Sequence, residues 1–122
     1  MAFKVEQQGM RPVLTPAWNS VDMRVPTPAV VAAGMVFVIA DGDAPEQFGP
    51  NGNLLNTEDR KSKTGHATLY ALDAGTGAVL FSSGDTMKSF SHFSAPAVAG
   101  GRAYAVTYDG TIYCFGLGIP QP

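Results

Sequence analysis

Cysteine is nearly absent from this sequence. Cys114 is the single cysteine among 122 residues, so the chain can form no internal disulfide and no zinc site from several thiolates. Its neighbours follow an apolar, strand-like pattern, which predicts a buried thiol that fills the core.

Charged residues are also few, and neither sign dominates. Asp, Glu, Lys and Arg make up 15% of the chain, and the formal net charge is −2. Because there is no basic cluster, we expect neither nucleic acid nor an anionic membrane surface as a partner. No apolar run is long enough to span a bilayer, and residues 1–6 contain no signal-peptide core.

Glycine and proline, by contrast, are plentiful. The chain has 14 glycines and 9 prolines, and 45% of its residues are hydrophobic. Glycine and proline favour turns and short strands and leave little room for long helices. We therefore predict one small all-β unit, or a piece of a larger one.

A repeated pattern runs through most of the chain. Pro-Ala-Val, then an apolar strand that ends in Asp-Gly, occurs at residues 28–42 and again at 96–110. The Leu/Ile-Tyr pair that follows recurs at a shorter offset, so residues 43–67 form an insertion in the first copy. Without this insertion the period is about 43 residues, within the range of about 40–50 for one four-stranded propeller blade.

The repeat predicts a β-propeller segment of about two four-stranded antiparallel blades. The first blade, residues 25–84 with the inserted loop at 43–67, is expected to have strands at 28–32, 35–40, 67–72 and 78–83. The second, incomplete blade and tail, residues 85–122, is expected to have strands at 96–99, 102–107 and 111–115. Asp109 and Gly110 are expected to form a two-residue hairpin loop. The N-terminal segment, residues 1–24, is expected to hold a lone outer strand near Trp18, whose ring packs at a blade interface.

The strongest local signal is the corner at residues 73–77, between two alternating apolar runs. An Asp carboxylate can accept backbone N–H groups two or three residues ahead, and glycine adopts positive φ without steric cost. Residues 68–81 therefore predict a tight hairpin.

This hairpin resembles a family motif. Its residues follow the spacing Ala-x-Asp-x-x-Thr-Gly-x-x-x-Trp of the docking motif in PQQ-like, quinoprotein-type β-propellers, at Ala71, Asp73, Thr76, Gly77 and Phe81. The flanking Pro-Ala-Val and Asp-Gly-Thr-Ile-Tyr steps are similar to the repeat around that motif. The resemblance implies a closed ring in which the motif locks each blade to the next through its aromatic residue.

The chain departs from the family pattern at two positions. Phe81 stands at the tryptophan position, and in the second copy Gly116 stands at the Asp position. The second blade therefore lacks the motif and a fourth strand, so the chain resembles the C-terminal blades of such a ring. The resemblance also implies a periplasmic or secreted protein, although the sequence itself leaves the compartment open.

The resemblance leads to three functional hypotheses. The first is a non-catalytic propeller segment that acts as a scaffold or protein-binding surface, with the remaining blades or further copies of itself as partners. The second is the C-terminal part of a PQQ-dependent oxidoreductase, similar to alcohol or sugar dehydrogenases, whose pyrroloquinoline quinone and calcium are held by other blades. The third is a carbohydrate-binding propeller. We expect no cofactor in this chain, because one cysteine cannot supply the vicinal disulfide that such dehydrogenases carry, and we favour the non-catalytic hypothesis.

The insertion is the segment that the repeat does not explain, and long loops in compact domains are often functional. Asp41, Asp43 and Glu46 offer carboxylate oxygens at short spacing, as a calcium site requires, but they lack the order of a calcium-binding loop. A solvated loop is the simpler interpretation, and the mixed charges of residues 58–63 are interpreted as its exposed face.

The two histidines, His66 and His92, are expected on the same face of the propeller as the insertion and Lys88. A catalytic pair is one interpretation, and structural or solvent-facing histidines are the favoured one.

Overall fold

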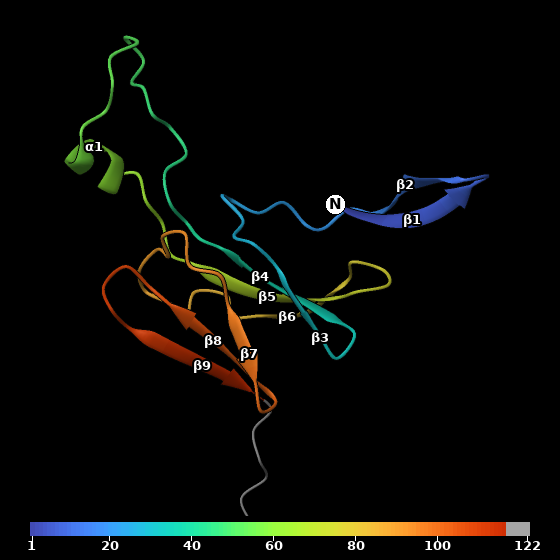
Figure 1. Ribbon diagram of the computed structural model, residues 1–122. Coiled ribbons are helices and arrows are strands. Elements are labelled where there is room, and N and C mark those ends of the chain that lie inside the picture. The colour runs from blue at the N-terminus through green and yellow to red at the C-terminus, as the bar shows by residue number, and fades with distance from the viewer. Residues whose placement is uncertain (117–122) are drawn as a thin grey trace, which may run out of the picture.

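The computed structural model describes residues 1–116, which fold into three small antiparallel sheets and one short helix (Figure 1). The all-β prediction is confirmed. None of the described helices is long and apolar enough to cross a membrane.

The first sheet is a hairpin of two strands, β1 (Ala2–Gln8) and β2 (Arg11–Trp18). The expectation of a lone strand near Trp18 is therefore wrong, because β2 pairs along its length with β1. Gly9, with φ +62°, opens the two-residue loop between them. Figure 1 shows this hairpin (blue) standing away from the other two sheets. Its side chains Phe3, Val5 and Leu14 are exposed.

The second sheet has four strands in the order β3 (Val30–Ala32), β4 (Met35–Ala40), β5 (Thr68–Asp73) and β6 (Val79–Ser82). All three pairings are antiparallel, as the first copy of the repeat predicts. The register of β4 against β5 pairs Phe37 with Ala71 and Ile39 with Leu69. These four side chains share one face, because residues two apart in a strand point to the same side.

The third sheet has three antiparallel strands, β7 (Ala97–Ala99), β8 (Arg102–Val106) and β9 (Ile112–Gly116). The loop between β8 and β9 is one residue longer than predicted. Thr107 N–H donates to Thr111 O at 3.0 Å, which leaves three residues, 108–110, in the loop. Gly110 adopts φ +83°, the left-handed geometry that a three-residue hairpin loop places at this position.

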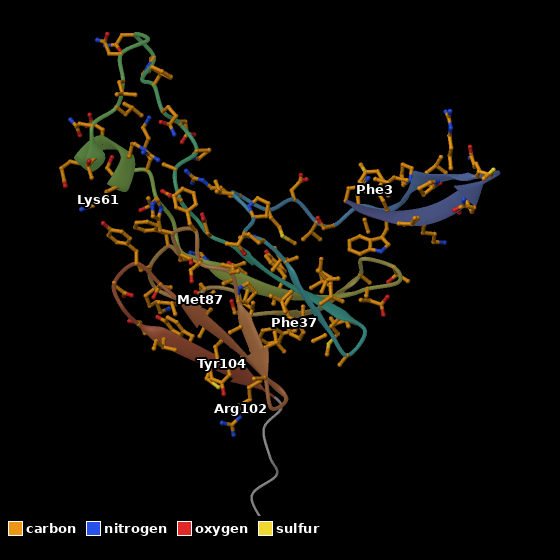
Figure 2. All side chains as sticks on the ribbon, in the orientation of Figure 1. Phe3, Phe37, Lys61, Met87, Arg102 and Tyr104 are labelled. Carbon is orange, nitrogen blue, oxygen red and sulfur yellow. The ribbon has the colours of Figure 1, made fainter. Side chains whose placement is uncertain are left out.

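The hydrophobic core lies between the four-stranded and three-stranded sheets. Ile39 and Leu69 pack there against Ala103 and Ala105, and Met87, from the segment that links the two sheets, is fully buried among them. Figure 2 shows Phe37 and Met87 in this layer. The strand alternation of both repeats therefore buries one face of each sheet against the other.

Cys114 is not part of this core. Its thiol is exposed on β9, so the predicted buried thiol is wrong. The physical reason is that β9 has alternating exposed and half-buried residues. Cys114 points to the face away from the four-stranded sheet, which none of the three sheets in residues 1–116 covers.

The insertion rises from the ends of β4 and β5 as a loop of its own (green in Figure 1). Gly65 N–H donates to Gly42 O at 2.8 Å and closes its base. Residues predicted as a charged loop form the one-turn helix α1 (Thr57–Lys61), which begins where the Asn56 side chain accepts from Asp59 N–H at 2.8 Å. An Asn at this position satisfies a helix N–H that has no partner inside the helix.

Candidate functional site

The turn between β5 and β6 is held by one carboxylate oxygen. Asp73 Oδ1 accepts the Gly75 N–H at 2.9 Å, the Thr76 N–H at 2.8 Å and the Thr76 hydroxyl at 2.9 Å. The Thr76 hydroxyl, followed by these backbone donors, holds the pKa of Asp73 below its ordinary value. The ionised carboxylate therefore stabilises the fold at neutral pH, and this contribution is lost as the pH falls through the lowered pKa.

Trp18, at the end of β2, lies on this turn. Its indole N–H donates to the Ala74 carbonyl at 3.0 Å. The ring also lies against Gly77, where a Cβ atom would overlap the indole. Gly77 has φ +76°, so both the backbone angle and the contact require glycine. Trp18 thus attaches the N-terminal hairpin to the turn of the four-stranded sheet.

Ala71 and Phe81 face each other across β5 and β6. Ala71 is buried, whereas Phe81 is 42% exposed and its ring centroid lies 5.8 Å from that of Phe115 in the three-stranded sheet. Phe81 thus contacts the neighbouring sheet without being enclosed by it.

Sequence reasoning placed Trp18 at an interface but did not identify the turn it contacts. The segment before Trp18 has no Asp-x-x-Thr-Gly pattern, so no local signal related this ring to the corner at residues 73–77. The repeat itself offered one indirect signal. Phe81 stands at the aromatic position of the motif around residues 73–77, and the repeat leads us to expect an equivalent aromatic ring one unit earlier in the chain.

A hollow of about 490 Å³ lies beside Trp18, on the face of the four-stranded sheet that points away from the core. The sheet contributes Val36, Val38 and Leu72, and the rest of the lining comes mainly from residues 18–29 that follow the hairpin. This face of the sheet is therefore apolar but is covered by a single irregular segment.

A second hollow, of about 150 Å³, lies between the insertion and the three-stranded sheet. His92, from the segment before β7, places Nδ1 2.7 Å from Asp43 Oδ2 at its edge. The other Asp43 oxygen accepts the Ala44 N–H at 2.7 Å. Phe90 and Tyr108 also line this hollow, with their rings stacked at 4.6 Å between centroids.

Asp41 forms hydrogen bonds with both segments that carry Asp43 and His92. Its side chain is 2% exposed, and its Oδ1 accepts the Asp43 N–H at 2.8 Å. Its backbone O accepts the Ser91 N–H at 2.8 Å, which ties the start of the insertion to the segment that carries His92. Burial raises the pKa of Asp41 above its ordinary value.

The structure brings together only part of the predicted surface. His92 and the insertion meet as predicted, but His66 is exposed at the base of the insertion and does not line the hollow. Lys88 Nζ donates to Asp85 O at 2.9 Å, and Lys88 is likewise outside the lining. Tyr108 and Arg60 were missed, because their position depends on how the insertion folds back on the sheet.

Asp41, Asp43 and Glu46, which were considered as calcium ligands but judged more simply part of a solvated loop, do not gather as a calcium site. Asp41 and Asp43 direct oxygens to backbone N–H groups and to His92, and Glu46 Oε2 lies 3.8 Å from Arg24. Within residues 1–116 no three His, Cys, Asp or Glu side chains gather as metal ligands. Because calcium needs six or more oxygens around it, this donor set does not fit the ion.

A comparison with known proteins found no family model, no curated protein and no solved structure that matches the chain.

Proposed function

We propose that this chain is a segment of a PQQ-like β-propeller, formed by its C-terminal blades, which serves as a non-catalytic scaffold or protein-binding surface. The observation that carries the proposal is the contact of Trp18 with the turn at residues 73–77. One antiparallel sheet ends in an aromatic ring, and that ring sits on the Asp-x-x-Thr-Gly corner of the next sheet through Ala74 O and Gly77. The resemblance to PQQ-like propellers implies that one blade is locked to the next by an aromatic contact of this kind.

The two larger sheets support the same proposal. They correspond to one four-stranded and one three-stranded blade, each antiparallel and packed face to face. The N-terminal hairpin then corresponds to the outer two strands of a preceding blade. The hollow beside Val36, Val38 and Leu72 lies where that blade's inner strands would pack.

The exposed apolar surface of the N-terminal hairpin favours other propeller blades as partners. Phe3, Val5 and Leu14 lie on the N-terminal hairpin and are 50%, 73% and 66% exposed. Their strand positions place them on one face, since β1 pairs Val5 with Leu14. Exposed apolar faces of this kind mark interaction sites, and unpaired strand edges promote association. The proposed partners are therefore other blades or further copies of this chain.

Light scattering behind size exclusion tests the proposal on the purified full chain. We expect a mass above the 12.8 kDa of one chain. The double variant Val5→Thr, Leu14→Thr keeps strand-forming residues but removes the apolar face, so its average mass should fall. Lys4→Thr, on the opposite face of β1, is the matched control and should behave as the parent. A parent chain that runs as a single 12.8 kDa species at all concentrations contradicts the proposal.

A further inference from the structure

The hollow between the insertion and the three-stranded sheet is assembled from three separate parts of the chain. The insertion, the segment before β7 and the β8–β9 loop line it with Asp43, Thr57, Arg60, Lys61, Thr64, Phe90, His92 and Tyr108. A volume of about 150 Å³ is that of several water molecules, at about 30 Å³ each. The space therefore suits a small, polar ligand.

Arg60 indicates that the ligand is negatively charged. Its Nε is buried and has no hydrogen-bond partner within the part of the chain that the structure describes. The ion pairs found in residues 1–116 also leave Arg60 without an acidic partner. A buried donor without an acceptor is rare and costly. The guanidinium presents a planar fork of donors that matches the oxygens of a carboxylate or phosphate.

Two neighbouring groups, a lysine ammonium and a histidine ring nitrogen, also line the hollow. Lys61 Nζ lies 5.8 Å from the centre of the Tyr108 ring (Lys61 is labelled in Figure 2). Its ion pair with Glu58, at 3.6 Å, joins exposed side chains and is therefore weak. His92 uses Nδ1 for Asp43, so Nε2 is the ring nitrogen left to contact a ligand.

Asp43 is the one carboxylate among the lining residues of this hollow, and it does not cancel the positive charge of Arg60 and Lys61. Its side chain is 11% exposed, and its two oxygens accept from Ala44 N–H and face His92 Nδ1. The lining thus combines one carboxylate, whose oxygens already have partners, with the cationic side chains of Arg60 and Lys61.

We infer that this hollow binds a compact oxyanion, a carboxylate or a phosphate, with Arg60 as its anchor and Lys61 and His92 Nε2 as further contacts. The inference is independent of the propeller proposal, because it rests on the insertion and the loops beside it. Carboxylate and phosphate share the chemistry that the guanidinium recognises, and separate titrations distinguish them.

Two-dimensional ¹H–¹⁵N NMR of the full chain provides the test. Sodium phosphate and sodium acetate are titrated separately, against sodium chloride at matched ionic strength. We expect saturable shifts of the His92 and Tyr108 amides with at least one oxyanion. Saturation by phosphate alone assigns a phosphate site, and saturation by acetate alone assigns a carboxylate site. Shifts that chloride reproduces, or that neither oxyanion saturates, overturn the inference.

Variants decide whether Arg60 is the anchor. Arg60→Gln should weaken binding by about tenfold or more, since it removes the charge and the donor fork. Arg60→Lys keeps the charge and should retain part of the affinity. Arg11→Gln makes the same charge change on the exposed N-terminal hairpin and should leave binding unchanged. Retained amide dispersion shows that each variant is folded, and His92→Gln serves as a second variant with reduced binding. Full affinity in folded Arg60→Gln overturns the inference.

Discussion

At the scale of single residues, Gly77 shows how one hydrogen atom in place of a side chain decides a contact between two sheets. Gly77 and Gly34 have nearly the same backbone angle, with φ +76° and +75°. A Cβ at Gly34 would meet nothing within 4 Å, whereas a Cβ at Gly77 would overlap the Trp18 ring. Substitutions at these two positions therefore distinguish the cost of backbone strain from the cost of losing the contact with Trp18.

We expect Gly34→Ala to lower the free energy of unfolding by about 1 kcal/mol, the cost of a non-glycine residue in the left-handed region. Gly77→Ala should cost roughly 2 kcal/mol more, because the indole must also be displaced. Urea unfolding followed by circular dichroism measures both. In a Trp18→Ala background the two alanine variants should cost the same. Equal costs in the parent background would show that the ring contributes nothing at this turn.

At the scale of elements, the strands of the two repeats are predictable from the sequence to within about two residues. Gly, Pro and Asp-Gly steps mark their ends, and the alternation of apolar residues marks the buried face, as in β4 and β5. Strand β1 was missed because its alternation of apolar and polar residues covers only Phe3 to Glu6, and the polar residues that follow gave no further strand signal. Helix α1 was missed because it has no buried residue and only one turn.

The candidate sites were predictable only where the signal is local. The Asp73 corner is such a case, since all its hydrogen bonds lie within four residues. The contact of Trp18 with Ala74 joins residues 56 apart in the chain, and that of His92 with Asp43 joins residues 49 apart. These contacts depend on how sheets and loops are placed in space, which the spacing of residues does not encode.

The attachment of the N-terminal hairpin can be followed directly, because Trp18 is the single tryptophan. We expect its fluorescence and the far-ultraviolet circular dichroism to change at the same urea concentration, since the docked ring belongs to the folded unit. Asp73→Ala removes the acceptor for three donors and should shift both transitions together to a lower urea concentration. A tryptophan transition that precedes the circular dichroism transition in the parent chain would contradict docking.

Asp109→Ala is the matched control for this experiment. Asp109 holds the β8–β9 loop by accepting the Thr107 hydroxyl at 2.6 Å and the Thr111 N–H at 3.1 Å. Its loss should destabilise that loop by a similar mechanism but leave the emission spectrum of folded Trp18 unchanged.

At the scale of the whole molecule, a propeller architecture does not require the cofactor chemistry of quinoproteins. The chain has one cysteine, and Asp41, Asp43 and Glu46 do not form a calcium site. Fold resemblance alone does not carry an activity.

We therefore expect pyrroloquinoline quinone, added with calcium to the full chain, to show no change in the quinone absorbance spectrum. Dye-linked oxidation of alcohols should likewise stay at the level of quinone without protein. Spectrophotometric titration measures the first and dye reduction the second. A stoichiometric complex would replace the scaffold proposal with the oxidoreductase alternative.

The insertion between β4 and β5 has a consequence for how this fold can change over evolutionary time. Residues 41–67 join two adjacent antiparallel strands that a loop of a few residues could connect. The entropy lost on closing a loop grows only with the logarithm of its length, by about 0.6 kcal/mol for each doubling. Extending a short hairpin loop to this length takes about three doublings, or roughly 2 kcal/mol. A sheet that is already paired can thus acquire, lengthen or exchange such a segment at small thermodynamic cost, so this edge of the molecule is where new binding properties can arise while the strands beneath stay the same.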